Sequence, residues 1–194
     1  MQNSRVIALV AALSALAPAF TPALAAETAP AVIDNERVKV FDTTSAMTAM
    51  PDDFVAISFA GGNAVFGHAG ETAGANGART VVIDLKNHPV PTLANNSGYP
   101  NAFPRPHIEK LLENDRVIVW RYRWNLGEPT PVHFHNTDVV VTYLEDSALQ
   151  STTPDGKSVV NDYKSGDIRF NKGNRVHTEL LVRGSASAVI TELK

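Results

Sequence analysis

Short runs of β-branched and aromatic residues, separated by turn-forming residues, fill the chain from Val38 to its end. The clearest runs are residues 117–124, 138–144 and 188–191. Short runs of this kind, with Gly, Pro, Asn and Asp between them, are typical of a β-sandwich or β-barrel. The only helical candidate, residues 108–113, is too short to organise a fold. The sequence therefore predicts an all-β protein.

The composition limits the chemistry that such a fold can support. The 194 residues include 17 Lys+Arg, 20 Asp+Glu, 6 His and no Cys. The formal net charge of −3 argues against a nucleic-acid partner, because phosphate binding needs a surplus of Lys and Arg. Without cysteine there is no disulfide, no thiolate nucleophile and no iron–sulfur cluster. Any metal ion must therefore be held by His and carboxylate ligands.

The first 25 residues have the pattern of an export signal. Arg5 precedes an apolar run over residues 6–20, and the small residues Ala23 and Ala25 suit a signal peptidase. The run is shorter than the roughly 20 residues of a membrane-spanning helix, which favours cleavage over anchoring. We therefore expect residues 1–25 to be removed and the mature protein to be periplasmic or secreted, with no membrane attachment.

Segments of the N-terminal part recur in the same order in the C-terminal part. The matched pairs are residues 35–41 with 114–120, 53–57 with 138–142, and 81–86 with 189–194. Between these segments the first copy is shorter, and it lacks the stretch that holds three histidines in the second copy. We therefore predict a shortened N-terminal half over residues 26–87, a proline-rich connector over residues 88–107 and a main domain over residues 108–194. The sequence leaves open whether the first half forms its own barrel or only extra strands.

Three of the histidines have a spacing that suits a metal ion. His133 and His135 are two residues apart, so on a strand both side chains point to one face. His177 lies at the end of a turn-rich segment further along the chain. Three neutral imidazoles that leave coordination positions open make a workable catalytic metal site. The alternative is that His133 and His135 are exposed loop residues and that His177 is a core histidine.

The segments around these histidines resemble the two motifs of the cupin superfamily. The matched residues are Gly127, His133 and His135 in the first motif, and Gly166, Asp167 and His177 in the second. The resemblance covers residues 114–194. It implies a jelly-roll β-barrel, also called a double-stranded β-helix, with a metal ion in its mouth. The expected fold is thus a cupin barrel preceded by a degenerate cupin-like N-terminal half.

One departure from the family pattern affects the metal ligands. The family has a Glu about four residues after the second His, and here that position is Val139. Asp138 is adjacent but has the opposite strand parity, so it could reach the metal only across a bulge. Three-His sites occur in thiol-oxidising and diketone-cleaving cupin dioxygenases, whereas loss of the Glu also produces metal-free binding barrels. The predicted ligands are His133, His135 and His177, with Asp138 as a further candidate.

Two further residues are candidates for catalytic roles. Glu179 shares strand parity with His177, so it could orient an imidazole or act as a general base. Tyr143 could line the barrel mouth. The structural alternatives are a solvent-facing pair of Glu179 with Arg175 and a plain core position for Tyr143.

Three functions are consistent with these features. The first is an exported enzyme with oxygenase, isomerase or lyase activity on a small polar or anionic metabolite. Its cofactor would be a divalent ion, with Fe(II) as the first candidate and Mn, Zn, Ni or Cu as alternatives. The second is a barrel, with or without metal, that binds a small molecule without turning it over. The third is a structural role in which the N-terminal half completes a sheet or pairs two subunits into a homodimer.

Overall fold

The computed structural model describes residues 29–194, so the predicted export signal, residues 1–25, lies outside the described residues. Within the described range the chain forms strands and turns and no helix, which confirms the all-β prediction. None of the described residues belongs to a helix long and apolar enough to cross a bilayer. The strands are β1 (Ala31–Asp34), β2 (Val38–Thr43), β3 (Phe54–Ser58), β4 (Ala64–Gly67), β5 (Thr80–Leu85), β6 (Ile108–Glu113), β7 (Val117–Trp124), β8 (His133–His135), β9 (Asp138–Tyr143), β10 (Ser147–Thr152), β11 (Ser158–Tyr163), β12 (Ile168–Asn171), β13 (Arg175–Gly184) and β14 (Ala186–Leu193).

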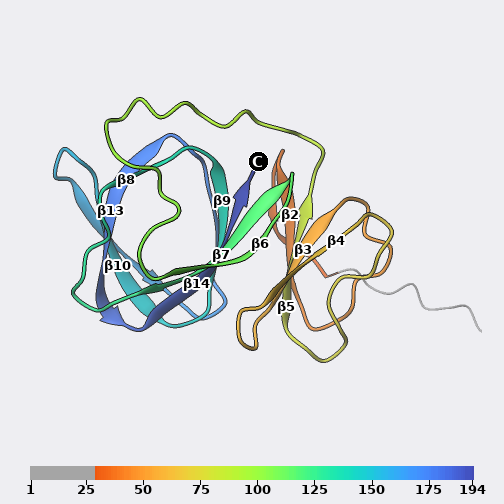
Figure 1. The fold of residues 1–194 in the computed structure, drawn as a ribbon. Coiled ribbons are helices and arrows are strands. Elements are labelled where there is room, and N and C mark those ends of the chain that lie inside the picture. Colours follow the sequence, from red (N-terminus) through yellow and green to blue (C-terminus); the bar gives the residue numbers. More distant parts are fainter. Residues whose placement is uncertain (1–28) are drawn as a thin grey trace, which may run out of the picture.

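The strands form three sheets, two of which close into a barrel (Figure 1). One wall of the barrel is a five-stranded sheet in the order β12-β9-β14-β7-β6, and the other is a four-stranded sheet in the order β11-β10-β13-β8. The third sheet lies beside the barrel and has the order β1-β2-β5-β3-β4. The N-terminal half is therefore a single sheet and not a second barrel.

The N-terminal sheet repeats the strand order of the five-stranded barrel sheet. In order across the sheet, β1, β2, β5, β3 and β4 take the places of β6, β7, β14, β9 and β12. The segments that resemble each other in sequence lie on three of these pairs, β2 with β7, β3 with β9 and β5 with β14. The strands without a counterpart are those of the four-stranded sheet. The N-terminal half thus lacks the wall that holds the histidines.

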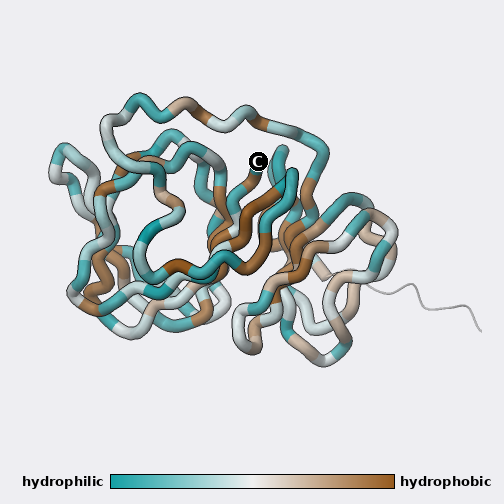
Figure 2. The backbone as a smooth tube through the Cα atoms, in the orientation of Figure 1, coloured by the Kyte–Doolittle hydropathy of each residue, from teal (hydrophilic) through white to brown (hydrophobic). Residues whose placement is uncertain are grey.

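One hydrophobic core joins the N-terminal sheet to the barrel. Val38 and Val40 of β2 pack in it together with Val117 and Val119 of β7, and all four side chains are fully buried. The strands where the two parts meet are also strongly hydrophobic in Figure 2. Full burial of such a side chain contributes about 1.5–3 kcal/mol. The sheet and the barrel therefore stabilise each other.

Two arginines at matched positions cross between the halves. Arg37, just before β2, donates from Nη1 to Asp138 Oδ2 at 3.2 Å, and Arg116, just before β7, has Nη1 3.6 Å from Asp53 Oδ2. Each arginine also donates from Nη2 to a backbone carbonyl where the last strand of the other half ends. Asp53 and Asp138 are also matched in the repeat, so the arginine of each half contacts the equivalent aspartate of the other half. These reciprocal contacts give the chain an approximate internal two-fold symmetry.

Replacing Arg37 by alanine is expected to lower the free energy of unfolding by about 3 kcal/mol, because Asp138 would keep a largely buried carboxylate without its partner. The side chains of Arg37 and Asp138 are 5% and 16% exposed. The matched Arg116→Ala change should cost about 1 kcal/mol or less, because Arg116 is 36% exposed. Denaturant-induced unfolding measures both values, and equal losses would contradict this account of the two contacts.

The helix expected over Ile108–Glu113 is wrong, because this segment is the edge strand β6. The hydrophobic residues Ile108, Leu111 and Leu112 have helical spacing, but the pairing register with β7 shifts between Lys110 and Leu112. The shift is a β-bulge that leaves Leu111 unpaired, and both leucines pack against the core that joins the halves. Sheet pairing thus overrides the helical spacing in this short segment.

The connector runs along the outside of the barrel and then turns into its opening (Figure 1). Part of it pairs with the edge strand β8, since Ala102 N donates to Phe134 O and Phe134 N donates to Pro100 O, both at 2.8 Å. The chain then continues into the barrel, where Phe103 and Arg105 lie beside the histidines. The connector therefore supplies one wall of the candidate site.

Candidate metal centre

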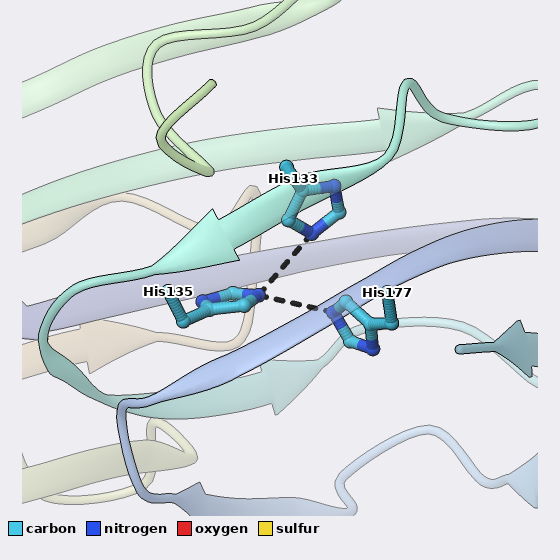
Figure 3. Close-up of side chains that lie close together, drawn as sticks. All are labelled: His133, His135 and His177. Carbon is cyan, nitrogen blue, oxygen red and sulfur yellow. Dashed lines mark hydrogen bonds between the residues drawn. The ribbon is translucent and has the colours of Figure 1, made fainter. Parts of the chain in front are cut away.

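Strands β8 and β13 bring the three histidines together inside the barrel (Figure 3). The strands are antiparallel neighbours in which His177 pairs with His133 and Arg175 pairs with His135. His133 and His135 share a face of β8 because side chains alternate along a strand. All three imidazoles are buried. The alternative in which His133 and His135 are exposed loop residues does not describe this structure.

The Nε2 atoms of the three imidazoles converge. His135 Nε2 lies 3.2 Å from His133 Nε2 and 3.1 Å from His177 Nε2. Two nitrogen ligands that are each roughly 2.1 Å from one ion lie roughly 3.0–3.4 Å apart. These two spacings are those of ligand atoms around one metal ion, and since all three ligand atoms lie within 4.8 Å of one another, the residues fit such an ion.

Hydrogen bonds on the far side of the rings orient two of the imidazoles. His133 Nδ1 lies 2.8 Å from the backbone oxygen of Pro131, and His177 Nδ1 lies 3.0 Å from Ser151 Oγ. A carbonyl oxygen only accepts, so Nδ1 of His133 carries the hydrogen and Nε2 keeps its lone pair. Partners of this kind hold metal-binding imidazoles in place. Nε2 of His133 thus keeps the lone pair that a metal ion would need, and in this structure it accepts a hydrogen bond from Arg105 Nη1 at 3.1 Å.

Burial keeps the imidazoles neutral. It lowers the pKa of His133 to about 4, with a further contribution from the charge of Arg105. Burial also lowers the pKa of His135, assisted by Arg175, and that of His177, where Glu179 opposes the change. An imidazole must be neutral to bind a metal ion. At neutral pH the group is therefore in its metal-binding protonation state.

Asp138 is not part of this group. Its carboxylate accepts hydrogen bonds from Arg37 and from the backbone N–H of Gly173 at 2.8 Å, and it lines a different pocket from the histidines. Val139, at the position where the family has a Glu, lines the cavity beside the histidines instead. The opposite strand parity of the two residues explains this arrangement. Among the described residues, the group contains three histidines and no carboxylate.

Glu179 and Arg105 form a buried ion pair next to the histidines. Arg105 Nη2 lies 3.3 Å from Glu179 Oε2, and its Nη1 lies 3.1 Å from His133 Nε2. Trp124 Nε1 also donates to Glu179 at 3.1 Å. Burial raises the pKa of Glu179, but the charge of Arg105, the hydrogen bond from Trp124 and other neighbouring groups lower it by more, so the carboxyl group stays ionised. The structure therefore brings Glu179 to the site as the partner of Arg105, and its action as a base stays a prediction.

Tyr143 lies in the same cavity, as part of a stack of aromatic rings. Its ring centroid is 3.9 Å from that of Tyr163 and 6.3 Å from that of Trp124. Burial raises the pKa of Tyr143 well above its ordinary value. The phenol is therefore protonated at neutral pH and can donate a hydrogen bond, while its catalytic role stays a prediction.

The sequence did not predict what the connector brings to the site. The ring of Phe103 lies 5.9 Å from that of His135, and the guanidinium of Arg105 lies 4.0 Å from the ring centroid of Tyr122. Prolines fix the backbone on both sides of Arg105. The sequence signal for this contribution was Arg105 itself, a cation between two prolines in the connector that precedes the motif-bearing domain.

Comparisons with known proteins show which chains this one resembles. No protein-family model matches the chain. The chain is 33% identical to the beta-alanine degradation protein BauB of Pseudomonas aeruginosa over 101 residues, which are 50% of this chain and 99% of that protein. A cupin 2 conserved barrel domain protein from Leptotrichia buccalis matches with a TM-score of 0.52 at 13% identity, over 90% of this chain and 92% of that one. A cupin domain from Bordetella pertussis covers 50% of this chain and 96% of its own at 26% identity, with a TM-score of 0.42.

Two of these matches are complementary. The Leptotrichia structure has the same fold over nearly all of this chain, including the N-terminal sheet. The BauB match covers almost the whole of that relative at 33% identity. Together with the motifs around His133, His135 and His177, these similarities show that the chain belongs to the cupin superfamily.

Proposed function

We propose that this protein is an exported cupin enzyme in which His133, His135 and His177 hold a divalent metal ion that acts on a small polar or anionic molecule. The observation that carries the proposal is the convergence of three buried, neutral imidazoles, with Nε2 atoms 3.1 and 3.2 Å apart. Fe(II) is the first candidate for the ion, with Mn, Zn, Ni or Cu as alternatives. Export rests on the pattern of residues 1–25.

The residues around the histidines suit chemistry on a bound ligand. A divalent ion bound there would supply Lewis-acid chemistry for an isomerase or lyase reaction, and a redox-active ion such as Fe(II) would also supply the redox chemistry of an oxygenase reaction. Phe103 and Val139 place apolar surface next to the imidazoles, which limits access of water. Tyr143 can donate a hydrogen bond, and Glu179 fixes the cationic Arg105 beside His133.

The relative supports the size and polarity of the proposed substrate. BauB is named for the degradation of β-alanine, which is a small amino acid. The cavity beside the histidines has a volume of about 160 Å³, which is below the roughly 300–1,000 Å³ of ordinary ligand pockets and favours a small ligand. Both facts support a small polar molecule as the substrate of this chain.

Metal analysis of the protein purified from its native compartment tests the proposal. We expect about one divalent ion per chain and its loss from the variant with both His133→Ala and His177→Ala. The control is His107→Ala, because His107 is exposed and lies outside the histidine group. Protein without metal, or a double variant that keeps its metal, would contradict the proposal.

A non-catalytic binding barrel is the second candidate. It is favoured by Val139 and Val141, which give the cavity an apolar wall on the strand where the family has its Glu ligand. Mass spectrometry of small molecules incubated with the metal-loaded protein separates the two candidates. Recovery of a bound molecule unchanged supports the binding barrel, and its conversion supports the enzyme.

A further inference from the structure

The charges in the cavity beside the histidines are unbalanced. The charged side chains of its lining are Arg105, Arg175 and Glu179. Glu179 pairs with Arg105 at 3.3 Å, whereas no ion pair in the described part of the chain includes Arg175. A divalent ion on three neutral imidazoles would add to the positive charge. The cavity therefore lacks one or more negative charges that a ligand could supply.

One nitrogen of the Arg175 guanidinium is hydrogen-bonded to the protein and the two outer nitrogens are not. It is the first residue of β13, opposite His135 in the pairing with β8, and its Nε donates to the backbone oxygen of Lys172 at 2.7 Å. Within residues 29–194, neither Nη atom has a hydrogen-bond partner, and the half-buried side chain lines the cavity. The two free nitrogens form a planar fork that matches a carboxylate.

We infer that the cavity binds a small carboxylic acid whose carboxylate pairs with the guanidinium of Arg175. The inference rests on the proposed function, because it names the ligand class of the same site. The cavity volume of about 160 Å³ is below the roughly 300–1,000 Å³ of ordinary ligand pockets, which suits a short acid. The planar fork of one guanidinium matches the two oxygens of one carboxylate.

The rest of the cavity can hold the remainder of such a molecule. Ser151, Asn161 and Asn171 provide hydroxyl and amide groups in its lining, which can bind a second polar group of the ligand. Tyr143 and Tyr163 provide a stacked aromatic surface for its carbon chain. These contacts suit a short carboxylic acid with one more polar substituent.

Binding of propionate and propionamide to the full chain as purified, and after treatment with a chelator, tests the inference. The two probes have the same shape and differ in charge, so we expect propionate to bind about 10- to 100-fold more tightly in both states. Arg175→Gln should remove this preference, and Arg175→Lys should keep part of it. The control is Arg183→Gln on the same strand, because Arg183 pairs with Asp162 at the surface.

Several results would overturn the inference. These are equal affinity of wild-type protein for the two probes, an unchanged preference in Arg175→Gln, or tighter binding of inorganic phosphate than of propionate. The metal content of Arg175→Gln should equal that of the wild type, because Arg175 is not in the histidine group. Loss of the propionate preference with normal metal content would thus leave the proposed function intact, whereas absence of metal in all variants would count against that function alone.

Discussion

Replacing His135 by alanine is expected to weaken the binding of Zn²⁺, used as a probe ion, by about 10²–10³-fold. Structural zinc sites with four ligands contribute roughly 10–16 kcal/mol, so one ligand contributes about 2.5–4 kcal/mol. His135 has the central place in the group, since its Nε2 contacts the Nε2 atoms of both other histidines. Isothermal titration calorimetry of the chelator-treated protein measures the change.

The control for this experiment is a histidine outside the barrel. His68 has an exposed side chain and pairs with Asp53 in the N-terminal half. His68→Ala should therefore bind Zn²⁺ as tightly as the wild type. A His135→Ala variant with wild-type affinity would mean that the ion binds elsewhere, and would contradict the assignment of the ligands.

The metal-free protein is expected to lose stability as the pH falls from about 6.5 to 4. Burial lowers the pKa of His133 from 6.5 to about 4 in the folded state. In this interval the unfolded chain binds a proton that the folded chain excludes, so the free energy of unfolding decreases with falling pH. At about 1.4 kcal/mol per pKa unit, His133 alone accounts for roughly 3 kcal/mol. Urea unfolding of chelator-treated protein at several pH values measures the loss.

Comparison with His133→Gln, which cannot take up the proton, isolates the contribution of His133 to this loss of stability. We expect the difference in unfolding free energy between wild type and variant to shrink by roughly 3 kcal/mol from pH 7 to pH 4. Carboxyl groups such as Asp84 and Glu192 titrate equally in both proteins and cancel in this difference. A difference that is constant with pH would show that His133 is not held neutral by burial.

Much of the fold could be predicted because strands and turns have local signals. β-Branched runs mark β7, β9 and β14, and the repeat correctly matched three pairs of strands that occupy equivalent places in two sheets. The segment Ile108–Glu113 was mispredicted because its hydrophobic spacing results from a bulge, which depends on the partner strand β7. Whether the N-terminal half forms a barrel depends on strands that are missing from it, and only the structure answers that.

The part of the candidate site that could be predicted is the part encoded by local spacing and by the alternation of side chains along a strand. His133, His135 and His177 follow from spacing and motif, and the structure brings them together. The position of Arg105 depends on the path of the connector across the barrel, which no local pattern encodes. The ion pair of Asp138 depends on Arg37, 101 residues away in sequence. The domain boundaries and the homodimer expected from the sequence stay predictions.

Anomalous X-ray scattering from crystals of the metal-loaded protein tests the central claim most directly. Data collected on both sides of the absorption edge of the bound metal locate the ion without reference to the histidines. The account predicts one strong peak among the Nε2 atoms of His133, His135 and His177. A peak that contacts fewer than three of these imidazoles, or no peak inside the barrel, would contradict it.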